Sequence, residues 1–324
     1  MTDAHSSSLE WCLCEVSVTP DFLIKQKRLP DQMPNLAERI NLNSRYYLKN
    51  NNSTMPLVPD DQAVEILKDS HVQFLDLRSV ILAAQLTLQD YAVFAAVEPT
   101  EYVDNLFRLR SKYGYPKLTQ FEELVNREMW WVSTEILMEK NLIRRAKIIK
   151  KFIKIAKHCR DFKNFNSMFA IISGLDKPSV RRLHNTWEKV SSKSVKALED
   201  MQVLLDPSRN MSKYRQHLAE AALDPPVIPL FPVLKKDLTF IHECNPTWVE
   251  GLVNFEKLRM IAKEIRTTNK FSSAPYALMV RHVKAYLNNF SVVSNEAQLD
   301  QMSAELEPQS TSSTFDIGRA FNIV

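Results

Sequence analysis

The stretch PPVIPLFPVLKKDLTFIHECNPTWVEGLVNFEKLRMIAKEIR, residues 225–266, predicts two helices joined by a short connection. Its prolines fix φ and remove amide donors, so the chain enters extended and begins a helix only around Pro232. We expect that helix to run to about His242. Pro246 disfavours helical backbone at the residue before it, and a second helix is expected from about Val249. Two helices joined so closely lie roughly antiparallel, which predicts a helical hairpin.

The first helix of this pair has two different faces. Three residues at helical spacing form an apolar stripe: Leu234, Leu238 and Ile241. Three polar residues share another face: Lys236, Thr239 and Glu243. The second helix carries an apolar side of its own: Phe255, Leu258, Ala262 and Ile265. Spacing alone favours an ordinary hairpin inside a helical core over one that presents a carboxylate to another molecule.

Bulk composition is that of a globular protein. The chain has 324 residues, 45% of them hydrophobic and 25% charged, and a formal net charge of +4. That charge is too small to indicate nucleic-acid binding by itself. The four cysteines lack the paired spacing of a zinc site, which favours free thiols in a reducing, cytosolic setting. The start of the sequence does not resemble a secretory signal, and no stretch approaches a membrane span.

The glycine content excludes several kinds of nucleotide site. Only four glycines occur, far apart: Gly114, Gly174, Gly251 and Gly318. A phosphate-binding P-loop or a dinucleotide fingerprint needs closely spaced glycines, so neither is present. The sequence also lacks the nucleophile elbow, the paired-histidine zinc motif and the C-x-x-C motif. We therefore expect no cofactor and no metal, and no covalent chemistry.

The sequence divides into five segments. We expect a disordered start at 1–10, a β-rich piece at 11–50, a linker at 51–75, an all-α domain at 76–292 and a disordered acidic tail at 293–324. Strands are expected at 11–18, 23–28 and 45–48. Helices are expected at 34–40, 63–70, 78–84, 88–94, 99–109, 117–140, 142–159, 164–175, 180–189, 195–205, 211–222 and 275–288. Asn164 or Asn166 is expected to cap the helix at 164–175.

The helix at 142–159 is amphipathic and basic. Four cations share one face: Arg144, Lys147, Lys151 and Lys154. Such a face fits nucleic-acid phosphates or anionic lipid, but a core helix with a solvated cationic side has the same pattern. No aromatic residues alternate with the cations, which argues against single-stranded nucleic acid.

Four blocks of sequence follow one another in an order that resembles a known family. They are LAAQLTLQDYAVFAAVEPTEYV at 82–103, NFNSMFAIISGLDKPSVRRLHNTWE at 164–188, DPSRNMSKYR at 206–215 and the proline-led stretch at 225–266. In this order they resemble the catalytic domain of guanine nucleotide exchange factors for Ras-family small G proteins. The resemblance implies a large all-α domain with a protruding helical hairpin.

Two further stretches refine the resemblance. KKDLTFIHE at 235–243 and LVNFEKLRMIAKEIR at 252–266 are most similar to exchange factors for Rap, especially the group that contains PDZ domains. Residues 15–51 resemble the end of the Ras-association domain that precedes the catalytic domain in that group. Residues 11–50 would then be a partial ubiquitin-like segment; the alternative is a strand remnant packed on the catalytic domain.

The resemblance implies non-covalent catalysis on a partner protein, not an enzyme that makes or breaks bonds. The hairpin would enter the nucleotide site of a Rap-like small G protein and disturb its switch, Mg²⁺ and phosphate contacts, so that GDP leaves. The catalytic residues would be Glu243, Thr239 and Lys236. The partner-binding residues would be Asn164, Asn166, Tyr214, Phe231 and Asn245, with simple burial as the rival interpretation. Residues 254–256 would be structural.

The same resemblance carries expectations about partners. The tightest complex should form with nucleotide-free G protein, in the cytoplasm and peripherally at membranes, with an anionic membrane surface as a further partner and no nucleic acid. The alternatives are an inactive or scaffold relative that binds small G proteins without exchange, or a lipid-binding helical module. The family commonly has glycine where Cys244 stands, and glycine suits a helix end with positive φ.

Overall fold

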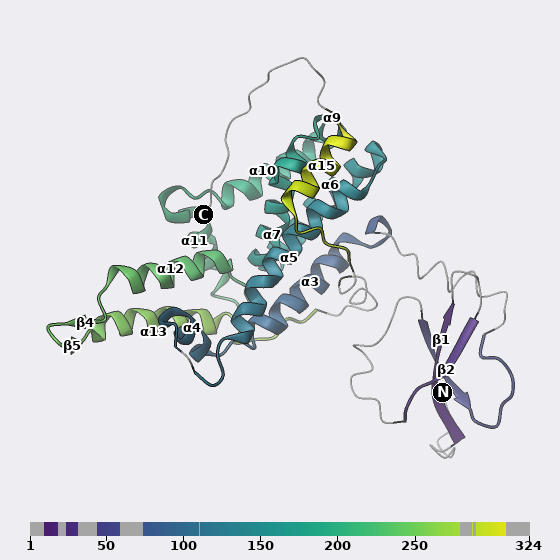
Figure 1. Cartoon of the computed structure of the whole chain (residues 1–324), viewed down its shortest axis with the longest axis horizontal. Coiled ribbons are helices and arrows are strands. Elements are labelled where there is room, and N and C mark those ends of the chain that lie inside the picture. Colours follow the sequence, from purple (N-terminus) through teal and green to yellow (C-terminus); the bar gives the residue numbers. More distant parts are fainter. Residues whose placement is uncertain are drawn as a thin grey trace.

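The computed structural model describes residues 10–18, 24–31, 44–58, 74–109, 111–278, 287 and 290–308. A small β region is followed by a large helical body (Figure 1), which confirms the predicted all-α fold class with a β-rich start. The helices expected at 34–40 and 63–70 lie outside the described residues, as do 1–9 and 309–324. A helix was also expected at 275–288. Its residues 275–278 are not helical, and residues 279–286 and 288 lie outside the described residues.

Three antiparallel strands form the β region. They are β1 (Trp11–Val18), β2 (Ile24–Arg28) and β3 (Ser44–Asn50), in the order β2-β1-β3. Alternate residues of β1 face one side and are buried: Cys12, Cys14 and Val16. This period of two is what the alternating sequence predicted. Whether the sheet derives from a Ras-association domain stays a prediction.

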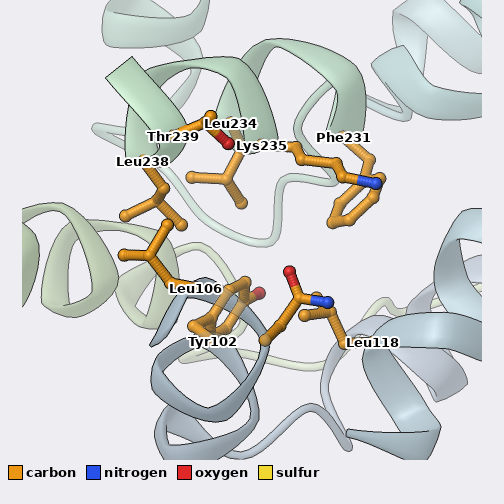
Figure 2. A pocket seen from close by; sticks show the side chains of 9 residues that line it. Tyr102, Leu106, Leu118, Phe231, Leu234, Lys235, Leu238 and Thr239 are labelled. Atoms are coloured by element: carbon orange, nitrogen blue, oxygen red, sulfur yellow. The ribbon is translucent and has the colours of Figure 1, made fainter. Parts of the chain in front are cut away.

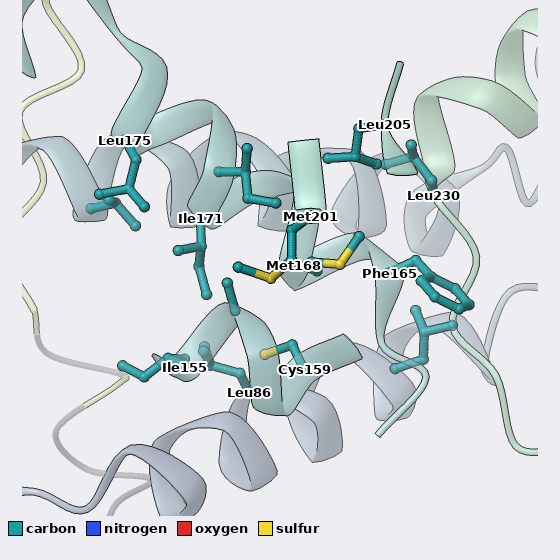
Figure 3. Close-up of a cluster of buried hydrophobic side chains, with 14 of the residues drawn as sticks. Leu86, Ile155, Cys159, Phe165, Met168, Ile171, Leu175, Met201, Leu205 and Leu230 are labelled. Carbon is teal, nitrogen blue, oxygen red and sulfur yellow. The ribbon is translucent and has the colours of Figure 1, made fainter. Parts of the chain in front are cut away.

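The core of the helical body is built around α7 (Phe165–Asp176). It packs against α3 (Ser79–Phe94), α5 (Pro116–Met138) and α6 (Leu142–Asp161). Figure 3 shows Met168, Ile171 and Leu175 of α7 among side chains of the neighbouring helices. Gly174 permits the close approach of α5, because a Cβ there would lie 2.6 Å from the carbonyl oxygen of Met129.

Shorter helices surround this core. They are η3 (Phe74–Asp76), α4 (Pro99–Phe107), α8 (Pro178–Arg181), α9 (His184–Glu188), α10 (Ser192–Leu204) and α11 (Ser208–Ala221). The sequence predicted one helix at 180–189 where the structure has α8 and α9. It predicted two helices at 78–84 and 88–94 where α3 runs unbroken, because the residues between them are buried and continue the turn. No single described helix is long and apolar enough to cross a membrane; α3 and α4 meet that test only together, across a bend of 71°.

The tail prediction was wrong over its first part. Helix α15 (Glu296–Leu306) packs on α5 and α8, with Leu299 fully buried. The residue after it, Glu307, forms a buried ion pair with Arg145 (3.3 Å) and accepts a hydrogen bond from Thr186 Oγ1 (2.6 Å). The polar composition had hidden an apolar stripe at helical spacing: Leu299, Met302 and Leu306.

The cationic face of α6 also needs a correction. Lys151 is buried, with its Nζ donating to the carbonyl oxygen of Leu77 and lying 5.0 Å from the centre of the Phe74 ring. Burial lowers the pKa of Lys151 to about 8. The other three predicted cations, Arg144, Lys147 and Lys154, are exposed; Lys157 is also exposed on α6, and Lys150 is half-buried.

Candidate functional site

Two antiparallel helices project together from the body (Figure 1). They are α12 (Phe231–Cys244) and α13 (Phe255–Lys270), and with the connection between them they form the helical hairpin. The predicted limits of α12, Pro232 and His242, are confirmed to within two residues. Pro232 stands at the first turn, where its missing amide would have no helical partner anyway.

The second helix begins later than predicted. Residues from Val249 onward were expected to be helical, but β4 (Trp248–Val249) pairs with β5 (Leu252–Val253) at the end of the hairpin. The two residues between these strands have positive φ, 50° at Glu250 and 82° at Gly251. Two successive positive φ values match the tight turn that fits the twist of two-residue strand connections, and Gly251 supplies one of them without steric cost. The Glu-Gly pair between apolar residues was the sequence signal that could have predicted this turn.

The faces of α12 lie as predicted. Leu234 and Leu238 are buried, and Figure 2 shows them pointing toward Tyr102 and Leu106 of α4. The polar residues are exposed: Lys236, Thr239 and Glu243. On α13, however, Phe255 is 72% exposed and Glu256 is exposed, so neither has the structural role that the resemblance implied.

Asn254 does have a structural role. Its Oδ1 accepts a hydrogen bond from the amide of Lys257 (3.2 Å), capping α13, and its Nδ2 donates to the carbonyl oxygen of Pro246 (3.0 Å). Lys257 is buried and donates from Nζ to Thr247 Oγ1 (2.8 Å). These bonds tie the start of α13 to the connection, which satisfies polar groups at the outer end of the hairpin.

The three polar residues of α12 line a single cleft of about 530 Å³ between α12 and α5. Phe240 and Cys244 line the same wall, and the opposite wall comes from α5: Glu122, Val125 and Asn126. An ion pair joins the two helices, with Lys235 Nζ 2.5 Å from Glu122 Oε1. Two carboxylates line the cleft: Glu122, which pairs with Lys235, and Glu243, which is exposed near the outer end of α12.

The base of α12 is held by a buried polar cluster. Asn164 caps α7 and donates from Nδ2 to Ser167 Oγ (2.9 Å) and Asp90 Oδ2 (3.2 Å), which confirms the predicted cap. Asn166 Oδ1 accepts a hydrogen bond from the amide of Phe231 (3.4 Å), the first residue of α12. The two asparagines therefore connect α3 and α7 to the base of the hairpin.

Two carboxyl groups in this cluster lie deep in the protein. Burial raises the pKa of Asp90, although hydrogen bonds from Ser167 and Asn164 oppose the rise. Burial, then repulsion from Asp90, raises the pKa of Glu128 well above its ordinary value. Ser167 Oγ lies 2.7 Å from Asp90 Oδ2 and 3.2 Å from Glu128 Oε1, so it links the two groups. The raised pKa values of both groups favour protonation, which would avoid burying two negative charges side by side.

Tyr214 and Phe231 complete the base of α12. The hydroxyl oxygen of Tyr214 accepts a hydrogen bond from the amide of Leu230 (2.7 Å), and burial raises the pKa of Tyr214. The ring of Phe231 packs edge-on against Phe121. Both side chains are at least 96% buried. In this structure they support the hairpin, and direct contact with a partner stays a prediction for them.

The predicted site residues thus fall into two groups. The catalytic set (Lys236, Thr239 and Glu243) is exposed at the cleft, whereas Asn164, Asn166, Tyr214 and Phe231 are buried at the base of α12. Asn245, the fifth predicted partner contact, caps the outer end of α12 by donating from Nδ2 to the carbonyl oxygen of Ile241 (2.9 Å). Cys244 is helical and is not among the residues with positive φ, so this position does not require the conformational freedom of glycine in this structure.

Sequence reasoning missed a left-handed turn at the start of α11. Arg209, Asn210 and Met211 all have φ between 51° and 56°. Arg215, one turn further on, binds both Asn210 and Asp237 of α12. The only signal was the run of turn-forming residues in DPSRN, which indicates a bend but not three left-handed residues.

Comparison with known proteins identifies relatives of this chain. The family model of the RasGEF domain matches residues 81–259. A "Rap guanine nucleotide exchange factor" of Caenorhabditis elegans is 56% identical over an alignment of 351 residues that covers 93% of this chain and 24% of the relative. Human "Rap guanine nucleotide exchange factor 6" is 58% identical over 264 residues, 82% of this chain and 16% of the relative. The chain thus spans a quarter or less of the length of these two relatives.

Proposed function

Because the chain belongs to the RasGEF domain family, we propose that it is a guanine nucleotide exchange module that accelerates the release of GDP from a small G protein of the Rap type. The Rap preference rests on the names of its relatives. The single observation that carries the proposal is the cleft between α5 and α12, with Glu243 and Thr239 exposed along one wall.

The proposed mechanism is non-covalent. A carboxylate brought close to Mg²⁺ and phosphate repels the phosphate charge and competes for the groups that hold the metal. Mg²⁺ tolerates distortion of its octahedral coordination poorly, so displacing its protein contacts favours release of the nucleotide. Glu243, exposed near the outer end of α12, is the group that would do this.

The neighbouring residues support Glu243. Thr239 lies one turn earlier on the same side of α12 and fills the adjacent space, while Lys236 is exposed on that wall and can pair with an acidic residue of the partner's switch. A protein that weakens GDP binding must itself be bound more weakly in the presence of GDP. The tightest complex is therefore the one with nucleotide-free partner.

A fluorescent GDP-release assay tests the function. Purified chain is added to Rap, Ras or Ral loaded with a fluorescent GDP analogue, and the release rate is measured against chain concentration. We expect Rap to respond most strongly. Binding to nucleotide-free Rap without faster release would instead identify a scaffold relative. No binding and no release with any of the three would overturn the proposal.

A second proposal concerns the location of exchange. Lys147, Lys154 and Lys157 are exposed on α6, Lys150 is half-buried beside them, and no acidic residue in the described ranges lies within ion-pair distance of any of the four. Each lysine near an anionic membrane contributes about 1 kcal/mol of attraction. We propose that this face lies against the cytoplasmic membrane surface. Cosedimentation with vesicles of neutral and of phosphatidylserine-containing lipid tests it, and equal binding to both would exclude it.

A further inference from the structure

Arg215 of α11 makes a two-point contact with α12. Its Nη1 and Nη2 each lie 2.7 Å from an oxygen of the Asp237 carboxylate. The side chains are 34% and 21% exposed, so the pair is partly shielded from water. A bidentate contact of this kind fixes orientation as well as distance, because the planar guanidinium matches the plane of the carboxylate.

The same guanidinium also binds the left-handed turn. Arg215 Nε donates to the carbonyl oxygen of Asn210 (2.7 Å), in the turn formed by residues 209–211. Left-handed backbone is costly for residues with a Cβ, so such a turn persists only where its surroundings hold it. Arg215 therefore fixes the start of α11 and the middle of α12 at once.

Arg215 and its neighbour hold α12 at two separate places. Tyr214 accepts a hydrogen bond from the amide of Leu230, and Arg215 forms its ion pair with Asp237. Asp237 lies seven residues after Leu230 in the chain. That separation is about 10 Å along a helix. A helix attached at one point can pivot, whereas two attachments this far apart fix the direction of its axis. Neither Arg215 nor Asp237 lines the cleft.

A second carboxylate, that of Glu264 on α13, also interacts with Arg215. Burial, followed by repulsion from Asp237, raises the pKa of Glu264 on α13, and Arg215 opposes that rise. Arg215 is thus paired with Asp237 of α12 and interacts electrostatically with Glu264 of α13. Without it, Asp237 and Glu264 would repel each other across the contact between α12 and α13.

We propose that Arg215 is a positioning residue for nucleotide exchange: by holding Asp237 in the presence of Glu264, it fixes the angle at which α12 presents its outer end to a partner. The inference rests on the proposed exchange function, but its structural half does not depend on any partner. Exchange requires the correct angle because a carboxylate displaced by about 1 Å loses much of its effect on the reacting groups.

The structural half is tested by distance measurement on the full chain. Cys244 is exposed at the end of α12 while Cys12, Cys14 and Cys159 are buried, so a spin label attaches selectively to Cys244. The Lys196→Cys variant on α10 supplies the second label. Pulsed electron paramagnetic resonance should give a narrow distance distribution, and adding Arg215→Met should broaden or shift it without changing the cooperative unfolding of the body. An unchanged distribution would overturn the proposal.

The functional half is tested by kinetics. Arg215→Met should lower kcat for GDP release about tenfold, the effect of one charge-assisted contact. KM should change less than about twofold, because the cleft is intact. The double variant Arg215→Met/Asp237→Asn should recover part of the loss, because it removes the repulsion with Glu264. Equal activity of the single and double variants, or a rise in KM alone, would overturn the positioning role.

A matched control comes from the body. Arg181 of α8 forms an ion pair with Asp176, and α8 packs on α5, α7 and α15. Arg181→Met removes a comparable arginine–aspartate pair and should leave both the label distance and kcat unchanged. If it lowers kcat as much as Arg215→Met, the effect is a general loss of stability and the proposal fails. If the wild-type chain releases GDP from no G protein, the proposed function fails, while the distance experiment still decides whether Arg215 fixes the direction of α12.

Discussion

The two ends of α12 differ in almost every physical respect. At its base, the amides of Leu230 and Phe231 are bonded to Tyr214 and Asn166, and the surrounding side chains are buried. At its outer end the residues of the cleft wall are exposed, with Phe240 64% accessible. The base is held by buried contacts with the body, whereas at the outer end Asn245 caps the helix but the side chains of the cleft wall remain exposed. In a helix of this kind, the residues that contribute to stability lie at one end and the residues proposed to act on the partner lie at the other.

The separation predicts that substitutions at the two ends have different consequences. Changes at the base should lower the free energy of unfolding and affect exchange only through the position of α12. Changes at the outer end should affect exchange and leave unfolding alone, because exposed residues away from special contacts contribute little to stability.

The largest expected effect is at the outer end. Glu243→Ala should slow GDP release from Rap about a hundredfold, since removing one preorganised electrostatic group commonly costs a factor of that order. The thermal unfolding midpoint should not change. Stopped-flow release and thermal melts measure the two quantities. Glu199→Ala, an exposed glutamate on α10, is the control. If Glu243→Ala loses as much affinity for nucleotide-free Rap as it loses release rate, Glu243 only docks.

The next effect is at the base. Tyr214→Phe leaves the buried amide of Leu230 without its acceptor, which should cost about 1–3 kcal/mol of unfolding free energy. Urea denaturation measures the loss, and Tyr113→Phe is the control because Tyr113 is 82% exposed. GDP release at saturating chain concentration should fall much less than in Glu243→Ala. A loss of exchange without a loss of stability would place Tyr214 in the partner contact instead.

The carboxyl pair at the base predicts a pH dependence. The pKa values of Asp90 and Glu128 are raised in the folded state, so between their unfolded and folded pKa values the folded protein binds more protons than the unfolded chain. Stability should therefore fall as pH rises from about 4.5, by up to about 1.4 kcal/mol per pH unit for each extra proton. Glu128→Gln should flatten that slope in urea denaturation from pH 5 to pH 8. Glu199→Gln should not, and an unchanged slope in Glu128→Gln would mean that the pair carries no extra proton.

Sequence reasoning predicted the faces of α12 better than the surroundings of its base. The faces of α12 followed from helical spacing because Leu234 and Leu238 had only to pack against α4. The burial of Tyr214 and Phe231 depends on where α11 and α5 meet α12, and no local pattern encodes that. Lys151 was assigned to the exposed side for the same reason, since the carbonyl oxygen of Leu77 that binds it comes from a distant segment.

The tail and the connection were missed for different reasons. An average over 293–324 is polar, and it concealed the apolar side of α15 that packs on the body. At the hairpin connection, the Glu250-Gly251 turn was a readable local signal that helical periodicity was allowed to outweigh. Both errors therefore concern local signals that were present in the sequence: the apolar spacing of Leu299, Met302 and Leu306, and the Glu250-Gly251 pair.

Substitution of Cys244, at the outer end of α12, is expected to have the smallest effect on stability and on GDP release. It tests whether this end of the helix keeps its conformation when the partner binds. Cys244 is the last residue of α12, it is exposed, and its φ is not positive. Glycine there gains nothing from its freedom at positive φ and loses helix propensity, so Cys244→Gly should cost no more than about 1 kcal/mol of unfolding free energy. The GDP-release rate should stay within about twofold of wild type.

Cys244→Ala is the matched control, because it removes the thiol without adding backbone freedom. The glycine and alanine variants should release GDP at equal rates if α12 keeps its helical end when the partner binds. A severalfold faster rate for glycine alone would mean that the chain must adopt positive φ at this position during exchange. The outer end would then be a part that rearranges in the complex, and the contrast with the fixed base would be greater than the free protein shows.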